Sequence, residues 1–252
     1  MTALPLERIA RSFHRHRASY DDHATPQSLV ARDLARRLDR ASGTRHFDSV
    51  FEFGCGSGHL TRALAARFAI GQLALNDLVA QALPQDLPCP ARFRTGPVED
   101  AELPARIDLL ASASTIQWLA DPAATLARLC ARVARGGWLA VSGFGPAQFR
   151  ELSAQNGAGA PSLMTPEAMA RLLPEGWQVA DCGQRVLRQW FAEPRDLLHH
   201  LRRTGVNGLA RRGWTRRDLA GFCTDLRAAH GDGTGRVPLS WHPVWLVAQK
   251  RD

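Results

Sequence analysis

The sequence contains no long hydrophobic run, no paired cysteine motif and only one tyrosine. Within its 252 residues no apolar stretch approaches the roughly twenty residues of a membrane-spanning helix. Residues 1–17 are basic but lack the apolar stretch and cleavage site of an export signal, so we expect a cytoplasmic location without membrane attachment. The five cysteines are dispersed and form no C-x-x-C pair, which argues against a disulfide framework or a zinc site. Other metal-ligand spacings and a Ser-His-Asp set are also absent, so we expect no metal.

Lysine is almost absent, and the net charge of +8 comes almost wholly from arginine. Such a charge attracts acidic partners over long range, but arginine enrichment also arises from coding composition alone. Aromatic side chains among basic ones, typical of nucleic-acid binding, occur only at Trp214, near Arg211, Arg212, Arg216 and Arg217. The charge alone does not decide between a solvated basic surface, an acidic protein partner and a nucleic acid, and we expect no nucleic-acid partner.

Apolar patterning in the first 145 residues alternates between strand-like and helix-like stretches. Thr25-Pro26 is typical of a helix start, and Leu29, Val30, Leu34 and Leu38 follow at helical spacing. The pattern then predicts strands at 48–53, 73–76, 107–111 and 138–144, with helices at 59–68 and 122–134, the second ended by Gly136-Gly137. Alternating strands and helices predict an α/β fold with a parallel sheet.

The C-terminal part carries helix caps and two further strand-like stretches. We expect a helix between Thr165-Pro166 and Pro174, a long strand at 178–191 and a final strand at 243–249. Between these strands, helices are predicted at 194–205 and 215–229, the second with a capping box formed by Thr215 and Asp218. This helical pair would form an insertion able to fold over the strand ends as a lid.

A glycine-rich turn follows the first predicted strand. Gly54, Gly56 and Gly58 stand between that strand and a helix, and Asp77 ends the next strand about twenty residues later. Glycines let backbone N–H groups approach a ligand, and a strand-end acid can accept ribose hydroxyls, so the spacing favours a nucleoside cofactor over an ordinary strand-to-helix turn. With Glu52 the pattern is E-x-G-x-G-x-G, which resembles motif I of the S-adenosylmethionine methyltransferases.

Further segments extend this resemblance to nearly the whole chain. They occur in order as Ser12-Phe13-His14-Arg15 with Tyr20-Asp21, Ala24 and Gln27, then Phe53–Gly58, Asn76-Asp77-Leu78, Ser112–Trp118 and Gly235–His242. Together they resemble the malonyl-[acyl-carrier protein] O-methyltransferases of biotin synthesis. The resemblance implies a Rossmann-like class I fold: a mostly parallel seven-stranded sheet with an antiparallel last strand, helices on both faces and a helical lid before the last strand. It implies one domain with an N-terminal cover at 1–40, a core at 41–192 and 236–252, and a lid at 193–235.

The same resemblance implies S-adenosylmethionine as the cofactor and assigns residues to its site. These are Glu52, Gly54, Cys55, Gly56, Gly58, Asn76, Asp77, Val98, Glu99 and Ser112. Where the family has G-D-[IV] near the adenine, this chain reads Gly96-Pro97-Val98-Glu99. Because proline has no side-chain hydrogen-bonding group, either the Val98 backbone or Glu99 would hold the adenine, or the adenine would be held less specifically. Glu52 could equally serve only as a hydrogen-bond acceptor within the turn.

On the substrate side the resemblance implies methyl transfer to the free carboxylate of a malonyl thioester on acidic acyl-carrier protein. A carboxylate calls for the planar donors of arginine, so we expect Tyr20 with Arg15 or Arg202 to bind it. Gln117 and His242 are predicted catalytic residues with Tyr20, and Trp241 a substrate contact. Purely structural interpretations also exist for Tyr20, Arg15, Gln117 and His242. A methyltransferase of small molecules or RNA, or a non-catalytic binding module, remains an alternative, and the sequence indicates no oligomeric state.

Overall fold

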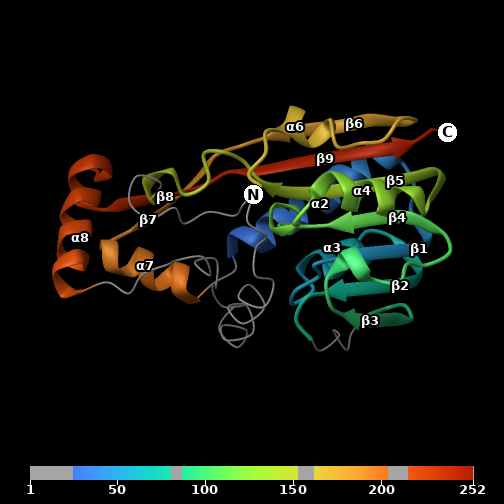
Figure 1. The fold of residues 1–252 in the computed structure, drawn as a ribbon, viewed down its shortest axis with the longest axis horizontal. Coiled ribbons are helices and arrows are strands. Elements are labelled where there is room, and N and C mark those ends of the chain that lie inside the picture. Colours follow the sequence, from blue (N-terminus) through green and yellow to red (C-terminus); the bar gives the residue numbers. More distant parts are fainter. Residues whose placement is uncertain (1–24, 81–86, 153–161, 204–214, 252) are drawn as a thin grey trace. The chain divides into compact units, whose positions relative to one another are not determined.

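The computed structural model describes residues 25–80, 87–152, 162–203 and 215–251 (Figure 1). The chain divides into two compact units. Among the described residues, the larger unit comprises 25–80, 87–145, 162–184 and 243–251, and the smaller comprises 146–152, 185–203 and 215–242. The expected division into cover, core and lid segments stays a prediction.

The larger unit contains a seven-stranded sheet with the order β3-β2-β1-β4-β5-β9-β6. Its strands are β1 (His46–Phe53), β2 (Ala69–Asp77), β3 (Ala91–Thr95), β4 (Ile107–Ser112), β5 (Val133–Phe144), β6 (Trp177–Gln184) and β9 (Pro243–Lys250). The first five are parallel, whereas β9 pairs antiparallel with both β5 and β6. This confirms the predicted Rossmann-like class I fold with an antiparallel last strand.

Helices cover both faces of this sheet (Figure 1). On one face α2 (Thr25–Ser42) and α3 (His59–Ala65) pack against β-strand residues such as Leu109 and Ala140. On the other, α4 (Pro122–Ala131) and α6 (Pro166–Ala170) pack against residues such as Leu110 and Val141. Consecutive strand residues thus enter opposite cores, as the two-residue period of a strand requires.

Helix α2 has the predicted start and spacing, with one exception. Val30, Leu34 and Leu38 are buried, but Leu29 is 44% exposed, so its placement on the apolar face was wrong. Each residue advances about 100° around a helix, and the buried arc runs from Val30 toward Ala31 and away from Leu29.

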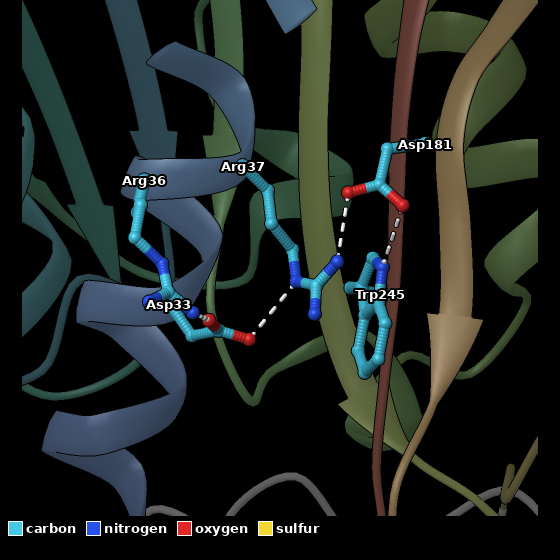
Figure 2. Close-up of polar contacts among 5 residues, drawn as sticks. All are labelled: Asp33, Arg36, Arg37, Asp181 and Trp245. Atoms are coloured by element: carbon cyan, nitrogen blue, oxygen red, sulfur yellow. Dashed lines mark hydrogen bonds and ion pairs between the residues drawn. The ribbon is translucent and has the colours of Figure 1, made fainter. Parts of the chain in front are cut away.

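Arg37 joins α2 to the antiparallel side of the sheet (Figure 2). Its Nη1 donates to Asp181 of β6 at 2.8 Å and its Nε donates to Asp33 at 2.9 Å. The guanidinium carbon lies 3.6 Å from the ring centroid of Trp245, whose Nε1 also donates to Asp181 at 3.1 Å. The Trp245 ring covers Gly183 so closely that an added Cβ there would lie 2.7 Å from Cζ2. The absence of a side chain at Gly183 therefore leaves room for this stack.

The predicted end of the helix at 122–134 was wrong. Gly136 and Gly137 do not end a helix: α4 ends at Ala131, and both glycines lie in β5. The pairing of β4 with β5 shifts there, Gly136 has a φ of 75°, and a Cβ at Gly137 would lie 2.7 Å from Val133 Cγ1. The glycines thus form a bulge that redirects the start of β5.

The predicted long strand at 178–191 is two strands in different sheets. Its first part is β6, which pairs with β9, and its second part is β7 (Leu187–Phe191), which pairs antiparallel with β8 (Val237–Trp241). The separation falls at Arg185 and Val186 and matches the boundary between the two compact units. Strands β3 and β8 were not predicted.

The smaller unit combines the β7–β8 sheet with α7 (Pro194–Arg203) and α8 (Arg216–His230). The predicted capping box of α8 is confirmed, with Thr215 Oγ1 accepting the Asp218 N–H and the Asp218 carboxylate accepting the Thr215 N–H. Trp241 is 1% exposed and packs edge-on against Phe149 and His200. In residues 25–80, 87–152, 162–203 and 215–251, none of the helices has the length and apolarity that crossing a membrane requires.

Candidate active site

The glycine turn follows β1 at the carboxyl edge of the parallel strands. Gly54, Gly56 and Gly58 have φ values of 62°, 52° and 84°, in the left-handed region that favours glycine. A Cβ at Gly54 would lie 2.1 Å from the hydroxyl oxygen of Thr115, whereas no described atom lies within 4 Å of a Cβ position at Gly56. Gly54 is therefore enclosed by protein, and Gly56 faces open space.

Asp77 holds this turn to the end of β2. Its Oδ2 accepts the Gly56 N–H at 2.8 Å and its Oδ1 accepts the Val79 N–H at 2.9 Å. Burial raises the pKa of the Asp77 carboxyl above its ordinary value of 3.8, while these two bonds lower it. Each carboxylate oxygen retains a lone pair beyond its N–H bond, so ribose hydroxyls could still donate to Asp77.

Glu52 lies behind the turn and is 1% exposed. Its Oε2 accepts the hydroxyl of Thr61 in α3 at 2.8 Å. Burial, with a smaller contribution from the nearby charge of Asp77, raises the pKa of Glu52 to about 8, although the Thr61 hydrogen bond acts to lower it. The described geometry gives Glu52 a bond to a helix side chain, and its predicted contact with the cofactor stays a prediction.

Three other predicted cofactor residues join elements of the site. The Asn76 side-chain amide donates to the carbonyl oxygens of Arg94 and Gly96, at 3.2 and 3.0 Å, and so connects the ends of β2 and β3. Ser112 Oγ donates to the Phe53 carbonyl at 2.7 Å and connects β4 to β1. The Cys55 N–H donates to the Asn76 carbonyl at 3.1 Å, and burial raises the pKa of the Cys55 thiol. These bonds fix the backbone positions from which a cofactor would be bound.

The segment expected near the adenine follows β3 and contains a short 3-10 helix, Val98–Asp100. Val98 is buried in the core, and its carbonyl accepts a hydrogen bond from Arg128. Glu99 is partly exposed, and the Cβ position of Gly96, at a φ of 131°, meets no described atom within 4 Å. The Val98 side chain and carbonyl are both engaged in the protein, and the predicted adenine contacts of Glu99 and the Val98 backbone stay predictions.

Gln117 lies in the loop after β4 and is 2% exposed. Its Nε2 donates to the Ser114 carbonyl at 2.6 Å, and its buried Oε1 has no hydrogen-bond partner among the described residues. Ser114 itself has a φ of 57°. The Thr115 hydroxyl lies 3.3 Å from the Gly54 carbonyl oxygen, to which it donates. Sequence reasoning missed Thr61 and Thr115, because no local pattern tells which hydroxyl reaches a strand or turn across the fold.

The predicted residues of the smaller unit have different surroundings. His242 is buried, and its Nδ1 accepts the Ala147 N–H at 2.9 Å. Trp241 Nε1 donates to Gln189 Oε1 at 3.2 Å, and its ring lies in the core of this unit. Arg202 is exposed on α7. Arg15 and Tyr20 lie outside the described residues, so the predicted pairing of Tyr20 with Arg15 or Arg202 stays a prediction.

Comparisons with known proteins identify the family. A methyltransferase domain model matches residues 26–210. A malonyl-[acyl-carrier protein] O-methyltransferase from Acinetobacter baylyi is 31% identical over 246 residues, covering 96% of both chains. The chain belongs to the malonyl-[acyl-carrier protein] O-methyltransferase family. A family member from Haemophilus influenzae is 31% identical over 251 residues, covering 99% of this chain and 96% of the relative.

Solved structures agree on the fold. The N-methyltransferase NodS from Bradyrhizobium japonicum, in complex with S-adenosyl-L-homocysteine, has a TM-score of 0.56 at 11% identity. That match covers 97% of this chain and 100% of the NodS chain. At this identity the likeness concerns the fold alone.

This family member is an S-adenosylmethionine-dependent O-methyltransferase. The residues present fit the cofactor: the open space beside Gly56 and Gly96 and the Asp77 carboxylate all lie at the carboxyl ends of neighbouring strands. Strand β1 lies between β2 and β4, where the strand order reverses, and such switch points bind ligands in open α/β sheets. When bound, S-adenosylmethionine supplies a methyl group on a positively charged sulfur.

Proposed function

We propose that this enzyme transfers a methyl group from S-adenosylmethionine to the free carboxylate of a malonyl thioester carried on acyl-carrier protein. The main support is the near full-length similarity to relatives that bear this activity in their names. The products would be a malonyl methyl ester on the carrier and S-adenosylhomocysteine. From the family resemblance, we further propose that this ester serves pimeloyl and biotin synthesis.

The chemistry requires positioning and not proton transfer. A carboxylate with an ordinary pKa near 4 is already ionised at neutral pH. One of its oxygens forms a bond to the methyl carbon, and the electron pair of the breaking carbon–sulfur bond goes to sulfur. The protein must align oxygen, carbon and sulfur and exclude water, and alignment alone supplies up to about 7–11 kcal/mol.

The cofactor end of this site is proposed at the carboxyl edge of β1, β2 and β4. The Gly56 backbone would face the cofactor, Asp77 would accept its ribose hydroxyls, and Gln117 would lie toward the methyl-transfer end. On the substrate side the proposal keeps Tyr20 with Arg15 or Arg202. Trp241 is a weaker candidate, because its ring is enclosed within the smaller unit.

The proposed protein partner is an acidic acyl-carrier protein. Arg216 and Arg217, at the start of α8, are exposed and belong to the arginine cluster noted in the sequence. Exposed arginines accelerate encounter with an acidic partner through attraction that weakens above a Debye length of about 8–10 Å. We propose these two residues as part of the carrier docking surface.

The decisive experiment measures methyl transfer by mass spectrometry. Purified enzyme with S-adenosylmethionine is incubated in parallel with malonyl-carrier protein, malonyl-CoA and RNA. A gain of one methyl group on malonyl-carrier protein, dependent on S-adenosylmethionine, is expected. Methylation of RNA alone would replace this proposal by the RNA alternative. Cofactor binding without product on any acceptor would favour a non-catalytic module.

A biological test addresses the pathway. Cells that lack the malonyl methylation step and require biotin are supplied with this gene. Growth without biotin is expected, and growth should disappear in an Asp77→Asn variant. Methylation in vitro without growth rescue would separate the reaction from the pathway.

A further inference from the structure

The outer edge of β8 is covered by residues 147–152, here termed the edge segment. The Phe149 N–H donates to the Ser240 carbonyl at 2.8 Å, and the Ser240 N–H donates to Glu151 Oε2 at 2.9 Å. The Ser240 hydroxyl, which is also buried, donates to Glu151 Oε1 at 2.5 Å. Without such partners the edge of this two-stranded sheet would leave buried backbone groups unpaired. The edge segment therefore replaces a third strand.

His242 completes this arrangement one residue beyond β8. Its Nδ1 accepts the Ala147 N–H at 2.9 Å, and its own backbone N–H donates to Gln148 Oε1 at 2.8 Å. His242 is 6% exposed. An imidazole nitrogen that accepts a hydrogen bond carries no proton, so the neutral ring has its proton on Nε2. The side chain and backbone of His242 are thus both used to hold consecutive residues of the edge segment.

Backbone strain within the edge segment supports a specific role for these bonds. Phe149 has a φ of 53°, an unfavourable value for a bulky residue. Such conformations persist only where surrounding contacts fix them, and they concentrate at functional sites. Here the contacts are the Phe149 N–H bond, the packing of its ring against Trp241 at 4.9 Å, and the bonds of Ala147, Gln148 and Glu151 on either side.

The edge segment is connected directly to the site through β5. It begins three residues after Phe144, where β5 ends. Near that end, the Ser142 carbonyl and hydroxyl oxygens lie 3.0 and 3.3 Å from the Ser114 nitrogen, in the loop whose Thr115 contacts Gly54. The backbone held by His242 therefore leaves the sheet at the edge where the glycine turn lies.

We propose that His242 is a positioning residue: a neutral imidazole that, through Nδ1, holds the edge segment in the conformation required for methyl transfer, and that transfers no proton. The inference rests on the proposed function, in which an ionised carboxylate attacks and no base is needed. It replaces the predicted catalytic role of His242 by one exerted through Ala147.

Two isosteric variants test it. In His242→Asn the side-chain Oδ1 occupies the place of Nδ1 and can accept the Ala147 N–H, whereas in His242→Gln the terminal groups correspond to Nε2. We expect His242→Asn to retain at least about one third of wild-type kcat/KM and His242→Gln to lose about tenfold or more, because it leaves the part-buried Ala147 N–H unpaired. The loss of activity in His242→Gln should be mainly in kcat, and its Kd for S-adenosylhomocysteine should stay within about twofold of the wild-type value. A proton-transferring His242 predicts the reverse order, with Gln retaining more activity or both variants equally inactive, and either result would overturn the proposal.

A second measurement needs no methyl acceptor and so remains valid if the proposed substrate is wrong. In wild-type enzyme labelled with 15N-histidine, the His242 signal is assigned by its absence from the spectrum of His242→Asn, or of His242→Gln if the first variant does not fold. An unprotonated Nδ1 and a protonated Nε2 at pH 7.5 are expected. A proton on Nδ1 would contradict the acceptor role outright. Failure of malonyl-carrier methylation with the expected tautomer would reject the proposed function alone.

Discussion

The carboxylate of Asp77 accepts the backbone N–H of Gly56 at 2.8 Å, so the acid predicted to bind ribose also fixes the turn predicted to face the cofactor. The two residues are separated by 21 positions and lie after neighbouring parallel strands. One carboxylate oxygen holds Gly56 and the other holds Val79. Substitution of Asp77 should therefore affect the shape of the glycine turn as well as cofactor binding.

We predict that Asp77→Asn lowers both stability and cofactor affinity. An amide has one oxygen, so its NH2 group would face one of the two N–H donors, and an unpaired buried donor costs about 1–3 kcal/mol. Chemical denaturation should reveal this loss, and calorimetry should reveal a larger loss in affinity for S-adenosylhomocysteine. Asp48→Asn, at an exposed position of β1, is the control and should change neither. Wild-type affinity in Asp77→Asn would remove Asp77 from the cofactor site.

Alanine substitutions at three glycines can distinguish the effect of backbone strain from the loss of contact with the cofactor. Gly43, Gly54 and Gly56 have φ values of 63°, 62° and 52°, so alanine at each introduces strain of about 1–2 kcal/mol. Only Gly54 adds a steric conflict, with Thr115, and only Gly56 is expected to face the cofactor across open space. We predict similar destabilisation in Gly43→Ala and Gly56→Ala, and more in Gly54→Ala.

Cofactor affinity should distinguish the first two variants. Calorimetry should give wild-type affinity for S-adenosylhomocysteine in Gly43→Ala and a loss of about tenfold or more in Gly56→Ala, because the added methyl group would occupy the approach to the backbone. Equal affinity in these two variants would place the cofactor elsewhere.

Glu52 should make the protein less stable as the pH rises from acid to neutral. Burial raises its pKa from 4.5 to about 8. Below pH 4.5 the group is protonated in both states, whereas between these values the unfolded chain releases a proton that the folded protein retains. Stability should fall across this window and level off above pH 8, by at most about 5 kcal/mol.

The matched variant is Glu52→Gln, whose amide oxygen can still accept the Thr61 hydroxyl. Denaturation of both proteins between pH 4.5 and 9 should show that Glu52→Gln is relatively more stable at high pH. A constant difference between the two proteins over this range would mean that Glu52 titrates normally.

Arg37 should contribute far more to stability than its neighbour Arg36. Both pair with Asp33, but Arg37 also bonds Asp181 and stacks on Trp245, and its side chain is 21% exposed against 48% for Arg36. Lysine cannot reproduce the stacked, forked geometry, so Arg37→Lys should cost about 1–3 kcal/mol. Arg36→Lys should change stability by less than about 0.5 kcal/mol. Thermal or chemical denaturation measures both variants. Equal losses of stability in Arg37→Lys and Arg36→Lys would mean that the shared pairing with Asp33 accounts for the whole contribution of Arg37.

Reversing the charge of Arg216 and Arg217 should weaken use of the carrier protein. The double variant to glutamate is expected to raise KM for malonyl-carrier protein about tenfold at low salt, with less effect at high salt. KM for malonyl-CoA should change by less than about threefold. Arg92→Glu with Arg132→Glu, an equal charge change at exposed positions of the larger unit, is the control. Full activity of the Arg216/Arg217 variant with carrier protein would exclude this docking surface.

Much of the fold could be predicted because its signals are local. The apolar run of β1, the capping box at Thr215 and the start of α2 each depend on a few adjacent residues, and all were found where expected. Gly136-Gly137 was misread because glycine is compatible both with a helix end and with a bulge in a strand. Only the pairing with the neighbouring strand β4 shows that these two glycines form a bulge.

The same distinction between local signals and long-range contacts applies to the site. Spacing alone indicated Gly54, Gly56, Gly58 and Asp77, since the ends of consecutive parallel strands meet at one edge. Spacing could not reveal that Asn76 and Ser112 connect strand ends, because their partners lie 18 and 59 positions away.

By itself the sequence determined the order of most strands and helices, the glycine turn with its acid, and the family, because each is carried by residues close together in the chain or by their order along it. Only the tertiary structure decided that the stretch at 178–191 splits between two sheets, that Arg37 connects α2 to β6, and that His242 holds residues 95 positions away. The physical reason is that a hydrogen bond or a stacked ring has no signature at one position, and exists only when distant segments are brought within a few ångströms.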